Sequence, residues 1–141
     1  MSNKIKTVLV VGASGMLGNT VMRLFASSPE YKVWGSARSN NFLMHMPKEL
    51  HNRVVTDIDV DNSDSLLRLF ELARPDVVIN CIGLVKQLSA AEDPLSAIPI
   101  NSMLPHRLAR ICNLIGARFV HVSTDCVFSG SKGNYCEGDP P

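Results

Sequence analysis

The chain has 141 residues, of which 45% are hydrophobic and 19% charged, and its formal net charge is +1. These values are typical of one globular domain with a buried core. They exclude a disordered chain and give no general attraction to nucleic acid or membrane surfaces. No apolar run approaches the roughly 20 residues that span a bilayer, and no apolar signal region precedes the first predicted strand. Four cysteines without a Cys-x-x-Cys pair indicate free thiols rather than a zinc site, so we predict a cytoplasmic domain.

Runs of β-branched and apolar residues alternate with segments of helical period along the chain. In chain order, the pattern predicts a strand at 8–11, a helix through Leu17 and Phe25, strands at 32–34 and 53–56, a helix from Asn62 or Ser63 to Arg74, a strand at 77–80, a helical stretch from Asp93 to Gly116 and a strand at 119–123. Pro99 and Pro105 are predicted to break or kink the last helical stretch. The runs "VLVV", "VVIN" and "FVHV" are apolar on both faces, which is typical of central strands in a parallel sheet.

This alternation predicts an α/β fold, a doubly wound parallel sheet of at least five strands joined by right-handed crossovers. In such sheets, ligands bind beyond the carboxyl ends of the strands. We therefore expect the chemistry of this chain in the segments that follow its predicted strands.

Three glycines spaced by threes follow the first predicted strand and open the first predicted helix. Gly12 allows a sharp turn, Gly15 removes a side chain where a pyrophosphate would approach, and Gly18 allows close packing of helix on sheet. The unpaired amides at the helix start, next to Met16 and Leu17, favour an anion, and the Ser14 hydroxyl can reach a phosphate. The alternative is a tight turn whose small residues serve packing alone. Because the strand, the turn and the helix occur in the right order, we predict a Rossmann-type NAD(P)-binding fold.

The end of the second predicted strand indicates which dinucleotide binds. An NAD site usually carries a carboxylate about 20 residues beyond the glycines, whereas "VWGSARS" has none and places Arg38 there. Ser36, Arg38 and Ser39 can bind a 2′-phosphate, which arginine recognises with paired hydrogen bonds. Arg38 as an ordinary solvated residue is the alternative. We predict NADP (NADPH) as cofactor, with NAD still open.

Further candidates follow the third and fourth predicted strands. Asp57, with its neighbour Ile58, can contact the adenine end of the cofactor, although a capping or loop role for Asp57 is equally open. The small or apolar residues Cys81, Ile82 and Gly83 can lie against the adenosine half, and Lys86 can meet a substrate phosphate or be merely solvated.

The fifth predicted strand ends in "HVSTDCVFSG", and "GNYCEGD" follows it. Together with "GASGMLG", "NCIG" and Asn101 in "IPINSMLPHRLA", these motifs resemble the extended short-chain dehydrogenase/reductase superfamily, and within it the dTDP-4-dehydrorhamnose reductase-like branch. The glycine motif is shared by the whole superfamily, while "STD-x-VF-x-G" followed by "G-x-Y-x-E" is much narrower. The matching motifs span the chain in the family's order.

The resemblance implies hydride transfer from NADPH to the 4-keto group of a nucleotide-linked sugar. It makes Thr124 the catalytic hydroxyl that hydrogen-bonds the carbonyl, and it adds Asn101 and Val122 to the cofactor contacts. A nucleotide sugar is then the expected partner, with a homodimer left open and neither nucleic acid nor membrane expected.

The sequence departs from the family in two places. The family's proton donor is a Tyr-x-x-x-Lys pair, but Tyr31 is followed at the fourth position by Gly35, and Tyr135 by Asp139. In addition, Cys126 stands where rhamnose reductases commonly carry tyrosine. We therefore interpret residues 1–141 as an incomplete NAD(P)-binding domain, without the substrate-binding region. Two other functions stay open: a non-catalytic NAD(P)-binding or sensing module, and an epimerase or dehydratase of the same superfamily.

Overall fold

A computed structural model describes residues 5–85 and 92–140 of the chain. In chain order the elements are β1 (Lys6–Val11), α1 (Met16–Ala26), β2 (Tyr31–Ser36), two 3-10 segments (Asn40–His45 and Lys48–Arg53), β3 (Val54–Val55), α2 (Ser63–Ala73), β4 (Val77–Asn80), α3 (Pro94–Ala97), a π-helical turn (Ile98–Met103), α4 (Leu104–Ile115), β5 (Arg118–His121) and a 3-10 turn (Asp125–Val127).

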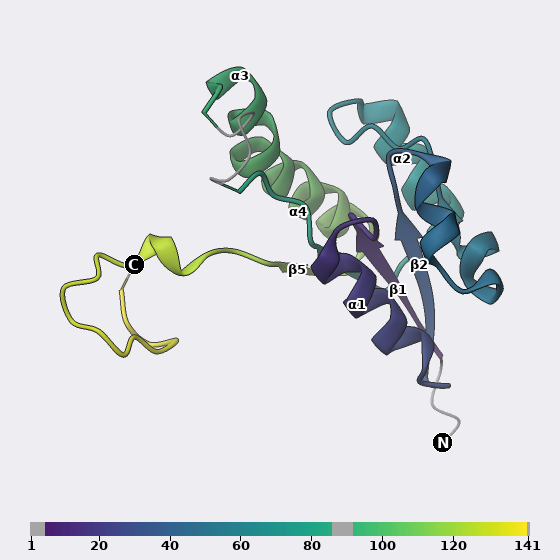
Figure 1. Ribbon diagram of the computed structural model, residues 1–141, viewed down its shortest axis with the longest axis horizontal. Coiled ribbons are helices and arrows are strands. Elements are labelled where there is room, and N and C mark those ends of the chain that lie inside the picture. Colours follow the sequence, from purple (N-terminus) through teal and green to yellow (C-terminus); the bar gives the residue numbers. More distant parts are fainter. Residues whose placement is uncertain (1–4, 86–91, 141) are drawn as a thin grey trace.

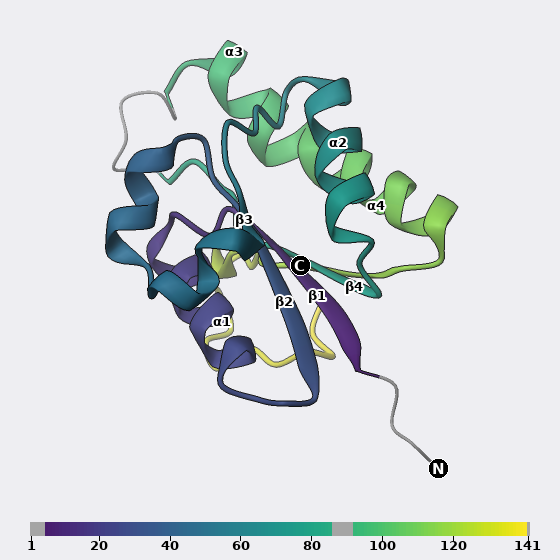
Figure 2. The same cartoon turned by 90° about the vertical axis from the view of Figure 1, so that its right-hand side faces the viewer.

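The five strands form one parallel sheet in the order β3-β2-β1-β4-β5 (Figure 1 and Figure 2). Because all the strands are parallel, each connection must cross over a face of the sheet, and the connection from β3 to β4 also passes β2 and β1. The predicted α/β fold with a doubly wound parallel sheet is confirmed. None of the helices within the described ranges is long and apolar enough to cross a membrane.

The sheet is covered on both faces (Figure 2). Successive side chains of β1 point to opposite faces, so Val8 and Val10 pack with Met22 of α1, while Leu9 and Val11 pack with α2 and α4. This arrangement explains why the run "VLVV" is apolar without alternation.

The prediction that "FVHV" is a central strand is wrong. β5 pairs with β4 and lies at the edge of the described sheet, where Val120 is 38% exposed. The strand ends at His121, so Val122 and Ser123 of the predicted strand lie beyond it. Apolar character on both faces shows that a strand can be buried, but the order of strands depends on pairings between distant segments.

The helix boundaries follow the predicted signals. Asn62 Oδ1 accepts the Ser65 amide hydrogen at 3.0 Å, and Asp93 Oδ1 accepts that of Leu95 at 3.0 Å. Gly116 ends α4 in the left-handed conformation, with φ of 72°. Pro99 and Pro105 do not stop the helical stretch, but a π-helical turn that contains Pro99 lies between α3 and α4.

One covering segment has no counterpart among the predicted elements. Between β2 and β3, the two 3-10 segments and the two residues between them bury Phe42, Met46 and Leu50 against the α1 side of the sheet. Short 3-10 turns lack the periodicity that predicts an α-helix, which is why the sequence pattern missed them.

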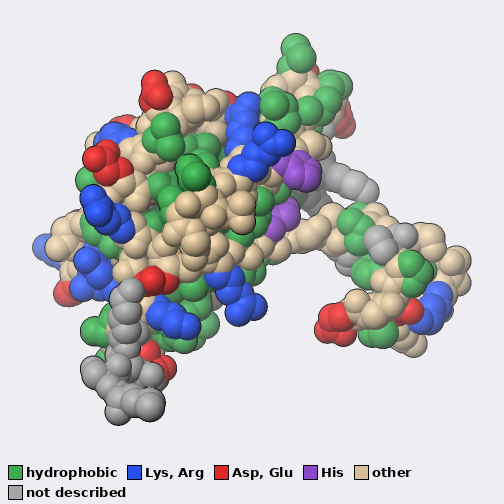
Figure 3. Space-filling model, turned by 180° about the vertical axis from the view of Figure 1, so that it is seen from behind, with side chains coloured by type: hydrophobic (Ala, Val, Ile, Leu, Met, Phe, Trp, Pro, Cys, Tyr) green, Lys and Arg blue, Asp and Glu red, His purple; other side chains and the backbone are tan. Residues whose placement is uncertain are grey.

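Charged side chains are interspersed over the surface, with no large area of one sign on the face seen in Figure 3. The same view shows the C-terminal segment, residues 123–140, projecting away from the body of the sheet and helices.

Candidate functional site

The turn after β1 needs a glycine at its first position. Gly12 has φ of +88°, and a Cβ there would lie 2.5 Å from Ile82 Cγ1. The Gly12 amide donates to Ser36 Oγ at 3.2 Å, while its carbonyl accepts the Gly15 amide hydrogen at 3.1 Å. The left-handed conformation and the close neighbour both exclude a side chain at Gly12.

The other two glycines of the motif differ in what surrounds them. A Cβ at Gly18 would lie 2.1 Å from the Gly12 carbonyl oxygen, so Gly18 is needed for packing of α1 on the turn. At Gly15 the nearest atom would be 3.5 Å away, an ordinary contact, and its φ of −75° is open to any residue. The protein's own packing therefore gives no reason for a glycine at Gly15, which is where a ligand would approach the backbone.

Gly15 is also the N-cap of α1, and within residues 5–85 and 92–140 no side-chain cap hydrogen bond is formed at this helix start. Amides at the start of a helix lack intrahelical partners and carry a partial positive charge. The geometry thus leaves a space beside the Gly15 backbone that suits an anionic group.

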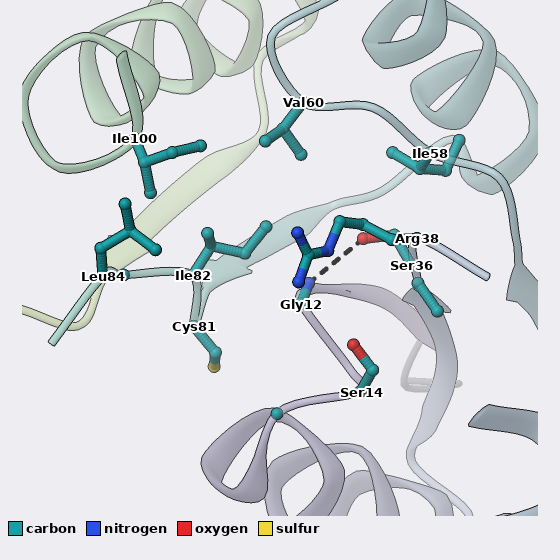
Figure 4. Close-up of a pocket in the computed structure, with 13 residues that line it drawn as sticks. Gly12, Ser14, Ser36, Arg38, Ile58, Val60, Cys81, Ile82, Leu84 and Ile100 are labelled. Atoms are coloured by element: carbon teal, nitrogen blue, oxygen red, sulfur yellow. Dashed lines mark hydrogen bonds between the residues drawn. The ribbon is translucent and has the colours of Figure 1, made fainter. Parts of the chain in front are cut away.

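A pocket of about 240 Å³ opens beside this turn, at the carboxyl ends of four strands (Figure 4). Its lining comes from the glycine turn, the end of β2, the segment after β3, the segment after β4 and the π-helical turn: Gly12, Ser14, Gly15, Ser36, Ala37, Arg38, Ile58, Val60, Cys81, Ile82, Gly83, Leu84 and Ile100. One side is polar and lies at the start of α1, whereas the opposite side is formed by isoleucine, valine and leucine side chains.

Most of the predicted cofactor residues come together in this pocket. Those that line it are Gly12, Ser14, Gly15, Ser36, Arg38, Ile58, Cys81, Ile82 and Gly83. Those that do not are Met16, Leu17, Gly18, Ser39, Asp57, Asn101, Val122 and the catalytic candidate Thr124. Lys86 lies outside the described residues. The binding roles of all of them stay predictions.

Arg38 extends from the end of β2 over the pocket in Figure 4. It is an exposed side chain, and no Asp or Glu is among the described residues that line the pocket. Because no carboxylate in this lining faces the Arg38 guanidinium group, the end of the pocket beside Arg38 suits a phosphate.

The carboxylate of Asp57 accepts a hydrogen bond within its own loop. Its backbone is left-handed, with φ of 58°, and Thr56 Oγ1 donates to its carboxylate at 3.2 Å. Arg68 donates to the Thr56 carbonyl oxygen at 3.2 Å, which ties this loop to α2. Asp57 lines a separate surface hollow with Asp59 and Asp64, and both of its open roles stay predictions.

Asn101 acts on the loop after β4. From the π-helical turn, its carboxamide accepts the Leu84 amide hydrogen at 2.8 Å and donates to the Leu84 carbonyl oxygen at 3.0 Å. Leu84 and Ile100, the residue before Asn101, both line the pocket. Asn101 therefore supports the pocket wall through a neighbouring backbone.

The pocket offers no activated thiol. Burial raises the pKa of Cys81, and it raises that of Cys112 in the core to about 11. Both groups are therefore protonated near neutral pH, and Cys81 contributes an uncharged surface to the pocket wall.

Thr124 belongs to the C-terminal segment. It is exposed, and its Oγ1 accepts the Cys126 amide hydrogen at 3.2 Å. Val122, just before it, continues the pairing of β5, because its amide donates to the Asn80 carbonyl oxygen at 3.1 Å. In the same segment, hydrogen bonds from the Lys132 amide and from Ser129 and Ser131 lower the pKa of Tyr135 to about 8.

Sequence reasoning missed part of the pocket wall. Ala37, Val60, Leu84 and Ile100 line the pocket but were not predicted to do so. Val60 lies two residues after Ile58, and Ile100 directly precedes Asn101. Their closeness in sequence to predicted contacts was the signal that could have identified them.

The parallel sheet, the glycine turn and the pocket at the strand ends define a Rossmann-type α/β protein. Residues 6–141 match the family model described as RmlD substrate binding domain, and the chain belongs to that family.

Curated relatives cover nearly the whole chain. It is 32% identical over 133 residues to a probable low-salt glycan biosynthesis reductase of Haloferax volcanii, an alignment covering 94% of this chain and 42% of the relative. It is 31% identical over 134 residues to a dTDP-4-dehydrorhamnose reductase of Burkholderia thailandensis, covering 94% of this chain and 39% of the relative. The chain thus spans about two fifths of the length of these relatives.

Solved structures agree with this family. A hypothetical dTDP-4-dehydrorhamnose reductase from Sulfolobus tokodaii superposes with a TM-score of 0.76 at 29% identity, covering 96% of this chain and 45% of that one. The dTDP-4-dehydrorhamnose reductase of Bacillus anthracis, solved in complex with NADP, superposes with a TM-score of 0.65 at 25% identity, covering 91% and 39%.

Proposed function

We propose that this chain is the cofactor-binding part of an NADP-dependent reductase that acts on the 4-keto group of a nucleotide-linked sugar. The observation that carries the proposal is the convergence of the glycine turn, Arg38 and an apolar wall on one pocket. Two relatives named as reductases, one for dTDP-4-dehydrorhamnose and one for glycan biosynthesis, support the substrate class.

The pocket residues fit a dinucleotide phosphate. The backbone at Gly15 and the Ser14 hydroxyl suit the diphosphate, because that glycine leaves room at an uncapped helix start. Arg38 suits the 2′-phosphate of the adenosine ribose. Ile58, Val60 and Ile82 offer an apolar surface for the adenine ring. The NADP complex of the Bacillus anthracis relative supports this choice of cofactor.

NADPH, when bound, would supply the hydride that reduces the ketone. Hydride addition leaves negative charge on the carbonyl oxygen, and a hydroxyl donor at that oxygen stabilises the charge. The family resemblance gives that role to Thr124. The Tyr-x-x-x-Lys proton donor of the family is not among these 141 residues, so the proposal concerns cofactor binding and carbonyl polarisation.

Titration with NADPH and NADH tests the choice of cofactor. We expect tighter binding of NADPH, and we expect Arg38→Ala to weaken NADPH binding roughly ten- to a hundredfold, about 1.5–3 kcal/mol, with little change for NADH. Arg110→Ala, which removes another exposed arginine on α4, is the matched control and should change neither affinity. An unchanged NADPH/NADH affinity ratio in Arg38→Ala would exclude Arg38 as the phosphate contact, and no binding of either cofactor would exclude the function.

A further inference from the structure

Two buried polar side chains lie at the carboxyl ends of the strands that flank β1. Ser36, at the end of β2, is 2% exposed, and Asn80, at the end of β4, is 0% exposed. A buried polar group is costly unless it is hydrogen bonded, so its partners indicate its role. Each of these two side chains accepts a backbone amide hydrogen from a segment that lines the pocket.

Ser36 binds two successive amides of the glycine turn. Its Oγ accepts the Gly12 amide hydrogen at 3.2 Å (Figure 4), and its carbonyl oxygen accepts that of Ala13 at 2.9 Å. The regular pairing of β1 with β2 ends at Val10 and Gly35, so the hydroxyl continues the hydrogen bonding where the two backbones separate. Without this hydroxyl, the Gly12 amide would lose its partner at a partly buried site.

Gly12 is confined from its other side as well. Asn80 Oδ1 accepts the Ile82 amide hydrogen at 3.1 Å, and Ile82 packs so closely on Gly12 that a Cβ on the glycine would lie 2.5 Å from it. The Gly12 carbonyl oxygen in turn accepts the Gly15 amide hydrogen and contacts Gly18. A displacement of Gly12 would therefore move the start of α1.

We infer that Ser36 is a positioning residue for dinucleotide binding. Its hydroxyl holds Gly12, and through Gly12 it holds the backbone at Gly15 where the diphosphate would lie. The role rests on the proposed function, and it differs from direct contact of Ser36 with the 2′-phosphate. Because the hydroxyl is already bonded to the turn, its effect should appear on the diphosphate rather than on the 2′-phosphate.

Two adenosine ligands separate these roles. ADP carries a 5′-diphosphate without a 2′-phosphate, and adenosine 2′-monophosphate carries the reverse. In the whole protein, we expect Ser36→Ala to weaken binding of NADPH and ADP about five- to thirtyfold, by loss of one partly buried hydrogen bond, and to leave adenosine 2′-monophosphate unchanged. Ser36→Cys nearly preserves the volume while replacing oxygen with a weak acceptor, so it should behave like Ser36→Ala even if the alanine variant folds poorly.

Ser63→Ala is the matched control, because Ser63 is an exposed serine at the start of α2 that does not line the pocket. It should leave all three affinities unchanged. The inference would be overturned if Ser36→Ala and Ser36→Cys bound NADPH and ADP as tightly as the wild-type protein does. So would a loss confined to adenosine 2′-monophosphate and NADPH, which would make Ser36 a direct contact. Failure of the wild-type protein to bind any of these ligands would instead remove the proposed function, and the inference with it.

Discussion

The pocket and the C-terminal segment are held together in different ways. Hydrogen bonds at the pocket join residues far apart in sequence, with Gly12 and Ser36 separated by 24 positions and Leu84 and Asn101 by 17. In the C-terminal segment, Tyr135 bonds to Ser129 and to the Lys132 amide, which are 6 and 3 positions away. The pocket therefore depends on contacts between segments that the sheet brings together, whereas the segment that carries Thr124 is held by hydrogen bonds between residues close in sequence. Changes in the two regions should have separable effects.

The largest expected effect is on catalysis. In the whole enzyme, Thr124→Ala should lower kcat roughly 10²–10³-fold, because it removes one donor to the developing oxyanion. NADPH affinity should stay the same, since Thr124 does not line the pocket. Steady-state kinetics and NADPH titration measure the two quantities, with Ser123→Ala as control. An unchanged kcat would exclude Thr124 as the donor to the carbonyl oxygen, and a parallel fall in affinity would contradict the separation of the two regions.

The next effect is on stability. Gly18→Ala should lower the free energy of unfolding by about 1–3 kcal/mol or more, because its Cβ would lie 2.1 Å from the Gly12 carbonyl oxygen. Gly138→Ala, in the C-terminal segment, meets nothing within 4 Å and should change stability by less than about 0.5 kcal/mol. Urea unfolding of both variants measures the difference. Equal stabilities would show that the turn adapts to a side chain.

Thiol reactivity should separate the same two regions. Cys126 and Cys136 in the C-terminal segment are exposed and should react first with iodoacetamide. Cys112 should resist, since it is buried and its pKa is raised to about 11, and Cys81 should react slowly because burial raises its pKa too. NADPH should slow Cys81 further without changing Cys126, as followed by mass spectrometry of peptides. Protection of Cys126 instead would place the cofactor elsewhere.

The smallest effect concerns pH. Hydrogen bonds from the Lys132 amide and from Ser129 and Ser131 lower the pKa of Tyr135 from its ordinary value of 10.0 to about 8. Between about pH 8 and 10, the ordered segment carries phenolate while the unfolded chain keeps its proton. The contribution of Tyr135 to the segment's stability therefore rises with pH across that window and is lost as pH falls through about 8. Ultraviolet titration should show a phenol midpoint near pH 8 that Tyr135→Phe removes, and an ordinary midpoint would contradict these hydrogen bonds.

The sequence predicted the sheet and much of the pocket because their signals are local. The three glycines stand between an apolar strand and an amphipathic helix, and Arg38 follows the next strand, so both could be placed at the same edge of a parallel sheet. The segments that bury Phe42 and Leu50 were not predicted, because they depend on packing between distant residues. The hydrogen bond from the Gly12 amide to Ser36 was not predicted either, because the two residues lie 24 positions apart.

By itself, the amino-acid sequence determined the alternation of strands and helices, the sharp turn at Gly12 and the absence of an acid after β2, since each depends on neighbouring residues. Only the tertiary structure decided that β1 lies between β2 and β4 and that Ser36 and Ile82 confine Gly12. The reason is physical. Local conformation follows from side-chain sterics and periodicity, but the order of strands and the partners of buried polar groups are decided when the whole sheet buries its apolar faces and satisfies its amides together.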